Sequence, residues 1–179
     1  ENISLSEHQE IFDTKVKMKD NLNILFLSRI TKMKNLLGAI KIINKTNKKI
    51  NFNIFGPVED ATYYNQVINE IEKVPKNIKI NINGPLLHKD IKKAFDQNHL
   101  FFLPTFGENY GHVIVESFLN NCPVLISNHT PWKNLADRNL GFVCNLKDEN
   151  KFIEKINYFF HMDQSSYDNY IKLMFKNVK

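Results

Sequence analysis

Apolar residues along this chain fall into two kinds of segment, short continuous runs and longer stretches with helical spacing. The short runs are typical of parallel strands that are buried in a sheet. They predict six strands, at residues 23–28, 50–55, 78–82, 100–103, 122–127 and 142–144. Because helical stretches alternate with these strands on short connections, we expect an α/β fold: a doubly wound, Rossmann-like parallel sheet with helices on both faces.

The helical stretches are recognised by apolar residues spaced three and four positions apart. The positions expected to face the core are Leu36, Leu37, Ile40 and Ile43; Tyr64, Val67, Ile68 and Ile71; Ile91, Ala94 and Phe95; Ile114, Val115, Phe118 and Leu119; Trp132 and Leu135; Phe152, Ile153, Ile156, Phe159 and Phe160; and Tyr167, Tyr170, Ile171 and Met174. Residues 1–20 are polar and irregular, so we interpret them as a linker or leading arm, and residues 21–179 as one domain. Because the chain begins at Glu1, we expect it to be a piece of a longer protein.

The segment from Leu100 to Ser127 is the unit around which the rest of the chain is arranged. It predicts a strand that ends at Pro104, a loop with glycines at 107 and 111, a helix over about 112–120, and a returning strand. A strand–helix–strand crossover of this kind presents its first loop at the carboxyl edge of the sheet. Open α/β sheets bind their ligands at that edge, so we expect the functional site there.

Two glutamates mark this unit, Glu108 in the loop and Glu116 about one turn into the helix. The helix N-terminus, near Gly111 and His112, offers free N–H groups to an anion. Carboxylates beside it can accept hydrogen bonds from sugar or ribose hydroxyls, so the combination suits a nucleotide sugar. The alternative is that Glu108 is a solvated loop residue, Glu116 a surface helix residue and His112 a structural histidine.

The same segment resembles the Glu-x7-Glu motif of the glycosyl transferases group 1 (GT4-like) family, which are retaining enzymes with the two-domain GT-B fold. The usual form is Pro-Ser/Thr-x-x-Glu-x-Phe/Tyr-Gly-x-x-x-x-Glu-Ala, ending in Gly-x-Pro-Val. The matching residues here are Pro104, Thr105, Phe106, Gly107, Glu108, Asn109, Tyr110, Gly111, Glu116, Ser117, Asn121, Cys122, Pro123 and Val124. Ser117 replaces the usual alanine. Asn121 replaces the glycine after the helix, where asparagine is the next-best residue for a left-handed conformation.

A second match follows the first strand, where the family has a Gly-Arg-x-x-x-x-Lys-Gly run. Arg29 and Lys34 keep both cations of that run, while Ser28 and Asn35 replace its glycines. An arginine fork and a lysine point charge suit a diphosphate, although Lys32 competes for the lysine role and all three could be ordinary surface charges. Gly84 and Leu86 resemble the family's Gly-x-Val/Leu loop, where the nucleobase packs, but Gly-Pro is also ordinary turn chemistry.

The resemblance covers residues from about 23 to 160 and implies that the chain is the C-terminal half of a GT-B fold, the donor-binding domain of a retaining glycosyltransferase of the hexosyltransferase type. Such enzymes transfer a sugar from a nucleotide diphosphate sugar without an essential metal or cofactor. The resemblance implies catalytic roles for Arg29, Lys34 and Glu108. It implies donor contacts for Glu116, Gly111, His112, Asn109, Tyr110, Gly84 and Leu86. An acceptor-binding N-terminal domain is the implied partner, absent from these residues, so the chain alone is expected to be inactive.

Composition narrows the other classes of function. The net charge of +5 fits a phosphate-bearing ligand, an anionic membrane surface or ordinary solvated lysines, and no aromatic interleaving suggests nucleic acid. Cys122 and Cys144 have no metal-ligand spacing and read as core residues in a reducing compartment. No apolar run is long enough to span a membrane, so we expect a cytoplasmic protein, with peripheral association at the inner membrane face as an alternative. The expected acceptor is a glycan or a lipid-linked saccharide.

Two other functions compete with this interpretation. A sugar-nucleotide epimerase of the same two-domain fold shares the donor site, and its own catalytic acids would lie outside this chain. A non-enzymatic receiver domain needs clustered acidic residues after its first and third strands. Ser28-Arg29 and Asn83-Gly84 stand in those places, which argues against a receiver.

Overall fold

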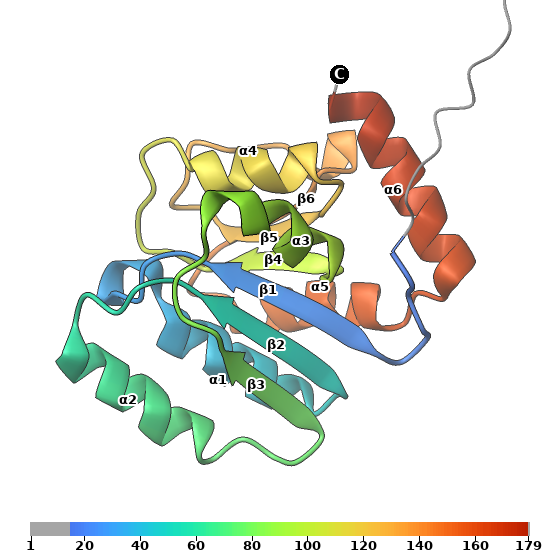
Figure 1. Ribbon diagram of the computed structural model, residues 1–179. Coiled ribbons are helices and arrows are strands. Elements are labelled where there is room, and N and C mark those ends of the chain that lie inside the picture. Colours follow the sequence, from blue (N-terminus) through green and yellow to red (C-terminus); the bar gives the residue numbers. More distant parts are fainter. Residues whose placement is uncertain (1–14, 179) are drawn as a thin grey trace, which may run out of the picture.

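The structure, a computed structural model, describes residues 15–178 (Figure 1). One parallel sheet with the strand order β3-β2-β1-β4-β5-β6 forms its centre. The strands are β1 (Leu22–Leu27), β2 (Ile50–Phe55), β3 (Ile78–Ile82), β4 (Leu100–Leu103), β5 (Val124–Ser127) and β6 (Gly141–Cys144). The order reverses between β1 and β4, which is the switch point of a doubly wound sheet, so the predicted fold class is confirmed.

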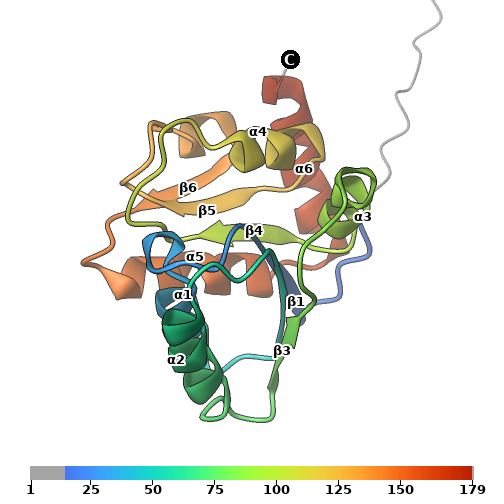
Figure 2. The same cartoon turned by 60° about the vertical axis from the view of Figure 1, so that its left-hand side comes forward.

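Helices cover both faces of the sheet, as expected from the alternation of strands and helices (Figure 2). The α-helices are α1 (Leu36–Thr46), α2 (Ala61–Ile71), α3 (Ile91–Asp96), α4 (His112–Leu119), α5 (Glu149–Phe160) and α6 (Gln164–Val178). Short 3-10 turns lie at η1 (Lys32–Lys34), η2 (His88–Asp90) and η3 (Ala136–Arg138). Helices α1, α2 and α5 lie on one face of the sheet, and α3, α4 and α6 lie on the other.

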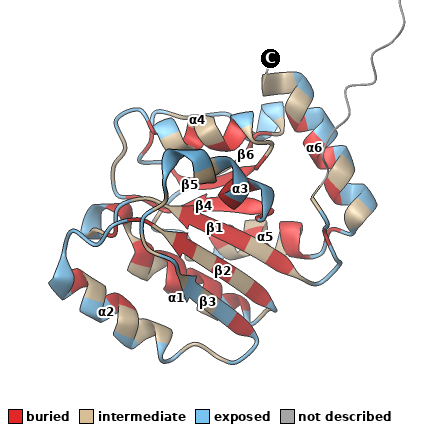
Figure 3. Cartoon of the chain, in the orientation of Figure 1, coloured by how far each residue is buried: buried red, intermediate tan, exposed pale blue. Residues whose placement is uncertain are grey.

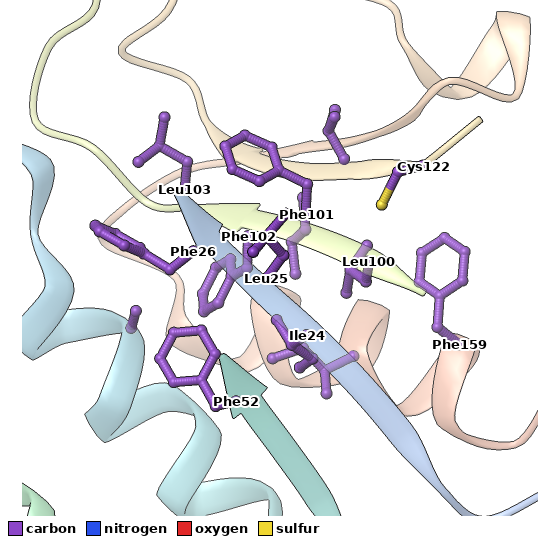
Figure 4. Packing of buried hydrophobic residues seen from close by; sticks show 14 of the residues in the cluster. Ile24, Leu25, Phe26, Phe52, Leu100, Phe101, Phe102, Leu103, Cys122 and Phe159 are labelled. Carbon is purple, nitrogen blue, oxygen red and sulfur yellow. The ribbon is translucent and has the colours of Figure 1, made fainter. Parts of the chain in front are cut away.

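The central strands are buried on both faces because helices pack above and below them (Figure 3). Every residue of β4 and β5 is buried, and Phe26 of β1 meets Phe52 of β2 edge to face at a centroid distance of 6.5 Å (Figure 4). Edge-to-face ring pairs stabilise a core beyond the area that they bury. Cys122 and Cys144 are buried and free, as predicted for core residues.

Two expectations for the helices are wrong, the burial of Leu119 and a helix around Trp132 and Leu135. Tyr64 of α2 packs partly buried against the core as expected, and its neighbour Tyr63 is buried, with its hydroxyl accepting a hydrogen bond from the Leu37 N–H at 2.8 Å. Leu119, at the last position of α4, is exposed. No α-helix forms around Trp132 and Leu135, where the chain makes only the 3-10 turn η3; Leu135 is nevertheless buried.

Residues 15–20 pack against the turn between α5 and α6. The buried Lys17 ammonium donates to the carbonyl oxygens of Phe160 at 3.3 Å and Met162 at 2.9 Å, where a cation is favourable at a helix C-terminus. Burial lowers the pKa of Lys17 to about 8. The expected linker at residues 1–20 lies mostly outside the described residues, so its boundary stays a prediction.

Candidate functional site

Two loops are joined at the carboxyl edge of the sheet, beside the switch point. The loop after β4 is tied to the loop after β1, since the Thr105 hydroxyl and the Phe106 N–H donate to the Met33 carbonyl at 3.0 and 2.8 Å. The same loop is tied to the loop after β5, because the Glu108 N–H donates to the His129 carbonyl at 3.1 Å. These bonds hold residues that are distant in sequence in one rigid arrangement.

Asn35 takes the place of the glycine expected after Lys34. Its φ of 57° is left-handed, which asparagine tolerates better than most residues. Its side chain accepts from the Gly38 N–H at 3.2 Å, capping α1, and donates to the Pro104 carbonyl at 2.8 Å. The replacement therefore preserves the backbone conformation and adds a link between the two loops.

Lys34 and Glu108 form a salt bridge across this edge, with 2.6 Å between Nζ and Oε2. Their side chains are only 10% and 17% exposed. A cation from the first-strand loop and a carboxylate from the fourth-strand loop therefore meet, a contact that the sequence motifs did not predict. Lys32, the competing lysine, is exposed, which favours Lys34 as the residue that belongs to the site.

Arg29 lies elsewhere in the same loop, and its guanidinium binds Glu59 with 3.0 Å between Nη1 and Oε2. Its side chain is 60% exposed, so this pair contributes little to stability. Glu59 was not foreseen as a partner. The structure therefore pairs the two predicted diphosphate cations with two different carboxylates.

Gly111 begins α4 in a left-handed conformation, with a φ of 79°. A Cβ at this position would lie 2.8 Å from Ile114 Cδ1 and 3.1 Å from Glu108 Cγ, so a glycine is needed there. No side chain caps the start of this helix. The first N–H groups of α4 thus carry no side-chain cap, and His112 beside them is exposed.

Trp132 braces the loop before α4, a role that the sequence did not suggest. Its Nε1–H donates to the Tyr110 carbonyl at 2.7 Å, and its ring lies 6.2 Å from that of Tyr110 and 5.3 Å from that of Phe118. Tyr110 also contacts His112 at a ring distance of 4.8 Å. Trp132 is the only tryptophan of the sequence and lies in the loop that follows β5. Its place in that loop was the only feature of the sequence that could have pointed to the site.

Glu116 lies on the first turns of α4 with an intermediate exposure. Within residues 15–178 its carboxylate makes no hydrogen bond or ion pair, so it is available to a ligand. Ser117, one position on, is buried and donates to the Cys122 carbonyl at 2.6 Å, while Asn121 adopts a left-handed φ of 49° as expected. Asn109 is exposed in the loop.

Gly84 and Leu86 lie beyond the end of β3. Gly84 has a φ of 73°, and its carbonyl accepts from the Gly56 N–H at 2.8 Å. Leu86 lines a hollow of about 220 Å³ with Phe55 and the adjacent face of α3. The apolar part of this wall is suited to a flat ring.

The part of the chain that the structure describes contains no cluster of three histidine, cysteine, aspartate or glutamate residues arranged to hold a metal ion. Among the same residues, none of the helices is long and apolar enough to cross a membrane.

The six-stranded parallel sheet, with its strand order β3-β2-β1-β4-β5-β6, is one half of a GT-B fold. A glycosyltransferase from Rickettsia africae matches with a TM-score of 0.74 and 19% identity, over 90% of this chain and 44% of its own. WaaG, a glycosyltransferase involved in lipopolysaccharide biosynthesis, matches with a TM-score of 0.71 and 14% identity, over 89% and 43%. HepE from Anabaena, solved with UDP and glucose, gives 0.64 and 16%, over 89% and 45%.

Family membership rests on the sequence. The model of the family "Glycosyl transferases group 1" matches residues 7–174, and this chain belongs to that family. A curated relative, the uncharacterized 41.2 kDa protein in the cps region of Klebsiella pneumoniae, is 30% identical over 140 residues, which are 76% of this chain. The chain spans 36% of that relative's length.

Proposed function

We propose that this chain is the donor-binding domain of a retaining glycosyltransferase and that it binds a nucleotide diphosphate sugar at the carboxyl edge of its sheet. The observation that carries the proposal is the 2.6 Å contact between Lys34 and Glu108. It brings a cation suited to phosphate and a carboxylate suited to hydroxyl groups together at one edge of the sheet. Membership of the glycosyl transferases group 1 family supports the same ligand class.

The donor competes with the salt bridge for both partners. Its diphosphate takes the Lys34 ammonium, Arg29 supplies a second cation from the same loop, and the uncapped start of α4 after Gly111 supplies N–H groups. Glu108, released from Lys34, accepts from hydroxyls of the transferred sugar, while Glu116 accepts from the ribose. Because charge builds up on the leaving diphosphate in the transition state, these fixed cations and dipoles stabilise that state more than the ground state.

The second wall of the catalytic cleft would come from an acceptor-binding domain outside this chain. The matched structures are about twice as long as the segment that they share with it, which supports a two-domain protein. The proposed acceptor is a glycan or a lipid-linked saccharide. Support comes from WaaG, which is involved in lipopolysaccharide biosynthesis, and from the relative in the cps region of Klebsiella.

Calorimetry with UDP, GDP and ADP tests the donor site. The wild-type chain is expected to bind at least one of them, and Arg29→Ala or Lys34→Ala to weaken it by about ten- to a hundred-fold, the cost of roughly 1.5–3 kcal/mol for a charge-assisted contact. The exposed neighbour Lys32 provides the matched control, since Lys32→Ala should leave the affinity unchanged. Added salt should weaken binding.

Two results contradict the proposal. One is failure to bind any of the three nucleotides. The other is an affinity that Lys34→Ala leaves unchanged, which would place the phosphates elsewhere. The purified chain should also show no sugar transfer, because half of the cleft is missing; turnover beyond slow donor hydrolysis would refute that part.

A further inference from the structure

A second hollow lies at the opposite edge of the sheet from the donor site. It has a volume of about 450 Å³ and is bounded by the end of α5, the middle of α6 and Asn139. Asn139 lies two residues before the start of β6 at Gly141, and α5 runs back from the end of β6, so the residues that line the hollow lie at the amino edge of the sheet. The carboxyl-edge loops therefore take no part in it.

Aromatic and aliphatic side chains form one wall of this hollow. Tyr158 is 48% exposed, and its ring is held by edge contacts with Phe142 at 5.6 Å and Tyr170 at 6.3 Å. Leu173 of α6 is exposed beside it. The wall is thus an apolar surface that is fixed from behind and open to a ligand.

Uncommitted polar groups stand around that surface. The side-chain amides of Asn139 and Asn169 make no hydrogen bonds within residues 15–178. Tyr170 is 7% exposed, and its hydroxyl has no hydrogen-bond partner among the described residues. That hydroxyl is covered by neighbouring atoms, so it lies behind the wall, and the polar groups open to a ligand are the side-chain amides of Asn139 and Asn169.

Charge decides between classes of ligand. Lysine, arginine, aspartate and glutamate are all absent from the residues that line the hollow, and His161, which does line it, is engaged with Asp20 at 3.1 Å. A phosphate or an ionised sugar would find no counter-charge there. A neutral pyranose fits, because its C–H face packs on an aromatic ring and its hydroxyls both donate to and accept from amides.

We propose that the hollow between α5 and α6 binds a neutral saccharide through Tyr158, Asn139 and Asn169. Such a site would hold a glycan away from the reacting edge and keep it close to the protein between transfers. The inference does not rest on the donor site, since it uses none of the same residues. Either the saccharide site or the donor site can therefore be disproved while the other stands.

Chemical-shift titration of the isotope-labelled chain with maltotriose, cellotriose and lactose tests the site. At least one of the three is expected to shift the amide signals of residues 158–173. Tyr158→Ala should weaken that binding about ten-fold, whereas Tyr170→Phe, which removes a hydroxyl covered by neighbouring atoms, should leave it unchanged. Asn169→Ala should also weaken it, whereas Asn65→Ala, an exposed amide on α2, should not.

Separate readouts keep the outcomes distinct. Tyr158→Ala should bind nucleotide as the wild type does, and Lys34→Ala should bind the saccharide as the wild type does. The proposal is overturned if all three saccharides leave these signals unmoved, or if Tyr158→Ala binds as tightly as wild type. It is also overturned if sedimentation shows that the hollow is a contact between two copies, with a dimer that Leu173→Ala dissociates.

Discussion

The Lys34 ammonium and the Glu108 carboxylate lie 2.6 Å apart, although 74 positions of chain separate the two residues. Both side chains are largely withdrawn from water, so each charge depends on the other as its partner. A donor that binds both Lys34 and Glu108 would replace the salt bridge with its own contacts to the two side chains. The salt bridge therefore links the loop after β1 to the loop after β4.

A double-mutant cycle measures this coupling. Lys34→Met and Glu108→Gln should each lower the free energy of unfolding because each leaves one charged or polar partner unpaired. The double variant should recover part of the loss, with a coupling energy of roughly 1–3 kcal/mol. The exposed pair Lys92 and Asp96 on α3 is the control, with about 0.3–0.5 kcal/mol expected. Strictly additive effects at Lys34 and Glu108 in urea unfolding would contradict this prediction.

Gly111→Ala tests whether the backbone at the start of α4 requires glycine. The new Cβ would be strained by the φ of 79° and would press on Ile114 and Glu108, so stability should fall by about 1–3 kcal/mol. Gly84→Ala is the matched control, since its φ of 73° gives similar strain but its Cβ would meet no atom within 4 Å. Melting transitions that fall equally in the two variants would show that the crowding near Glu108 costs nothing.

The sheet could be predicted from the sequence because its signals are local. β2 and β3 match the expected ranges to the residue, since Gly56-Pro57 ends one and Pro75 precedes the other. β5 starts at Val124, two residues later than expected, because Pro123 has no N–H to donate and the Cys122 N–H bonds to the Ser117 carbonyl in the preceding turn. Such boundaries depend on hydrogen bonds that periodicity does not reveal.

Only the parts of the site that lie in continuous sequence motifs could be predicted. Glu108 and Lys34 each stood in a recognisable run, but their direct contact is a tertiary fact, as is the pairing of Arg29 with Glu59. Trp132 was expected in a helix, and its hydrogen bond to the Tyr110 carbonyl could not be foreseen, because it links two loops 22 positions apart. Contacts between side chains of different loops can be identified only from the three-dimensional structure.

His99 gives the protein an acid-sensitive element at the start of β4. Its Nδ1 accepts from the Asn23 N–H at 3.0 Å, so the proton of the neutral ring is on Nε2, which donates to the Val16 carbonyl at 2.9 Å. Burial lowers the pKa of His99 from 6.5 to about 4, and Lys17 and Lys15 act in the same direction. Between these values the unfolded chain binds more protons than the folded one.

Stability should therefore fall as the pH drops from 6.5 through 4, by on the order of 3 kcal/mol from this residue. His99→Gln, which cannot titrate, should flatten the pH dependence across that window. His161→Gln, at an exposed histidine, should leave it unchanged. The measurement is urea unfolding at a series of pH values, and parallel curves for wild type and His99→Gln would contradict the assignment.

The two glutamates of the motif should be separable by the ligands that they lose. Glu116, on α4, is expected to contact the ribose, so Glu116→Ala should weaken a nucleotide sugar and the bare nucleoside diphosphate alike. Glu108 is expected to contact the transferred sugar, so Glu108→Ala should weaken the nucleotide sugar by roughly 1.5–3 kcal/mol more than the diphosphate.

The contact between Lys34 and Glu108 leads to a further expectation for the affinity of the bare diphosphate. Removing Glu108 frees the Lys34 ammonium for phosphate, so Glu108→Ala should bind the bare diphosphate as tightly as wild type or more tightly. Calorimetry with UDP and UDP-glucose, or with the corresponding pair for whichever nucleotide binds, measures both affinities. The control is a cooperative melting transition for each variant well above the temperature of the binding measurement, because Glu108 pairs with Lys34 and Glu116 shares its helix with the buried Ile114 and Phe118. Equal losses for both ligands in Glu108→Ala would mean that this glutamate orders the loop and does not contact the sugar.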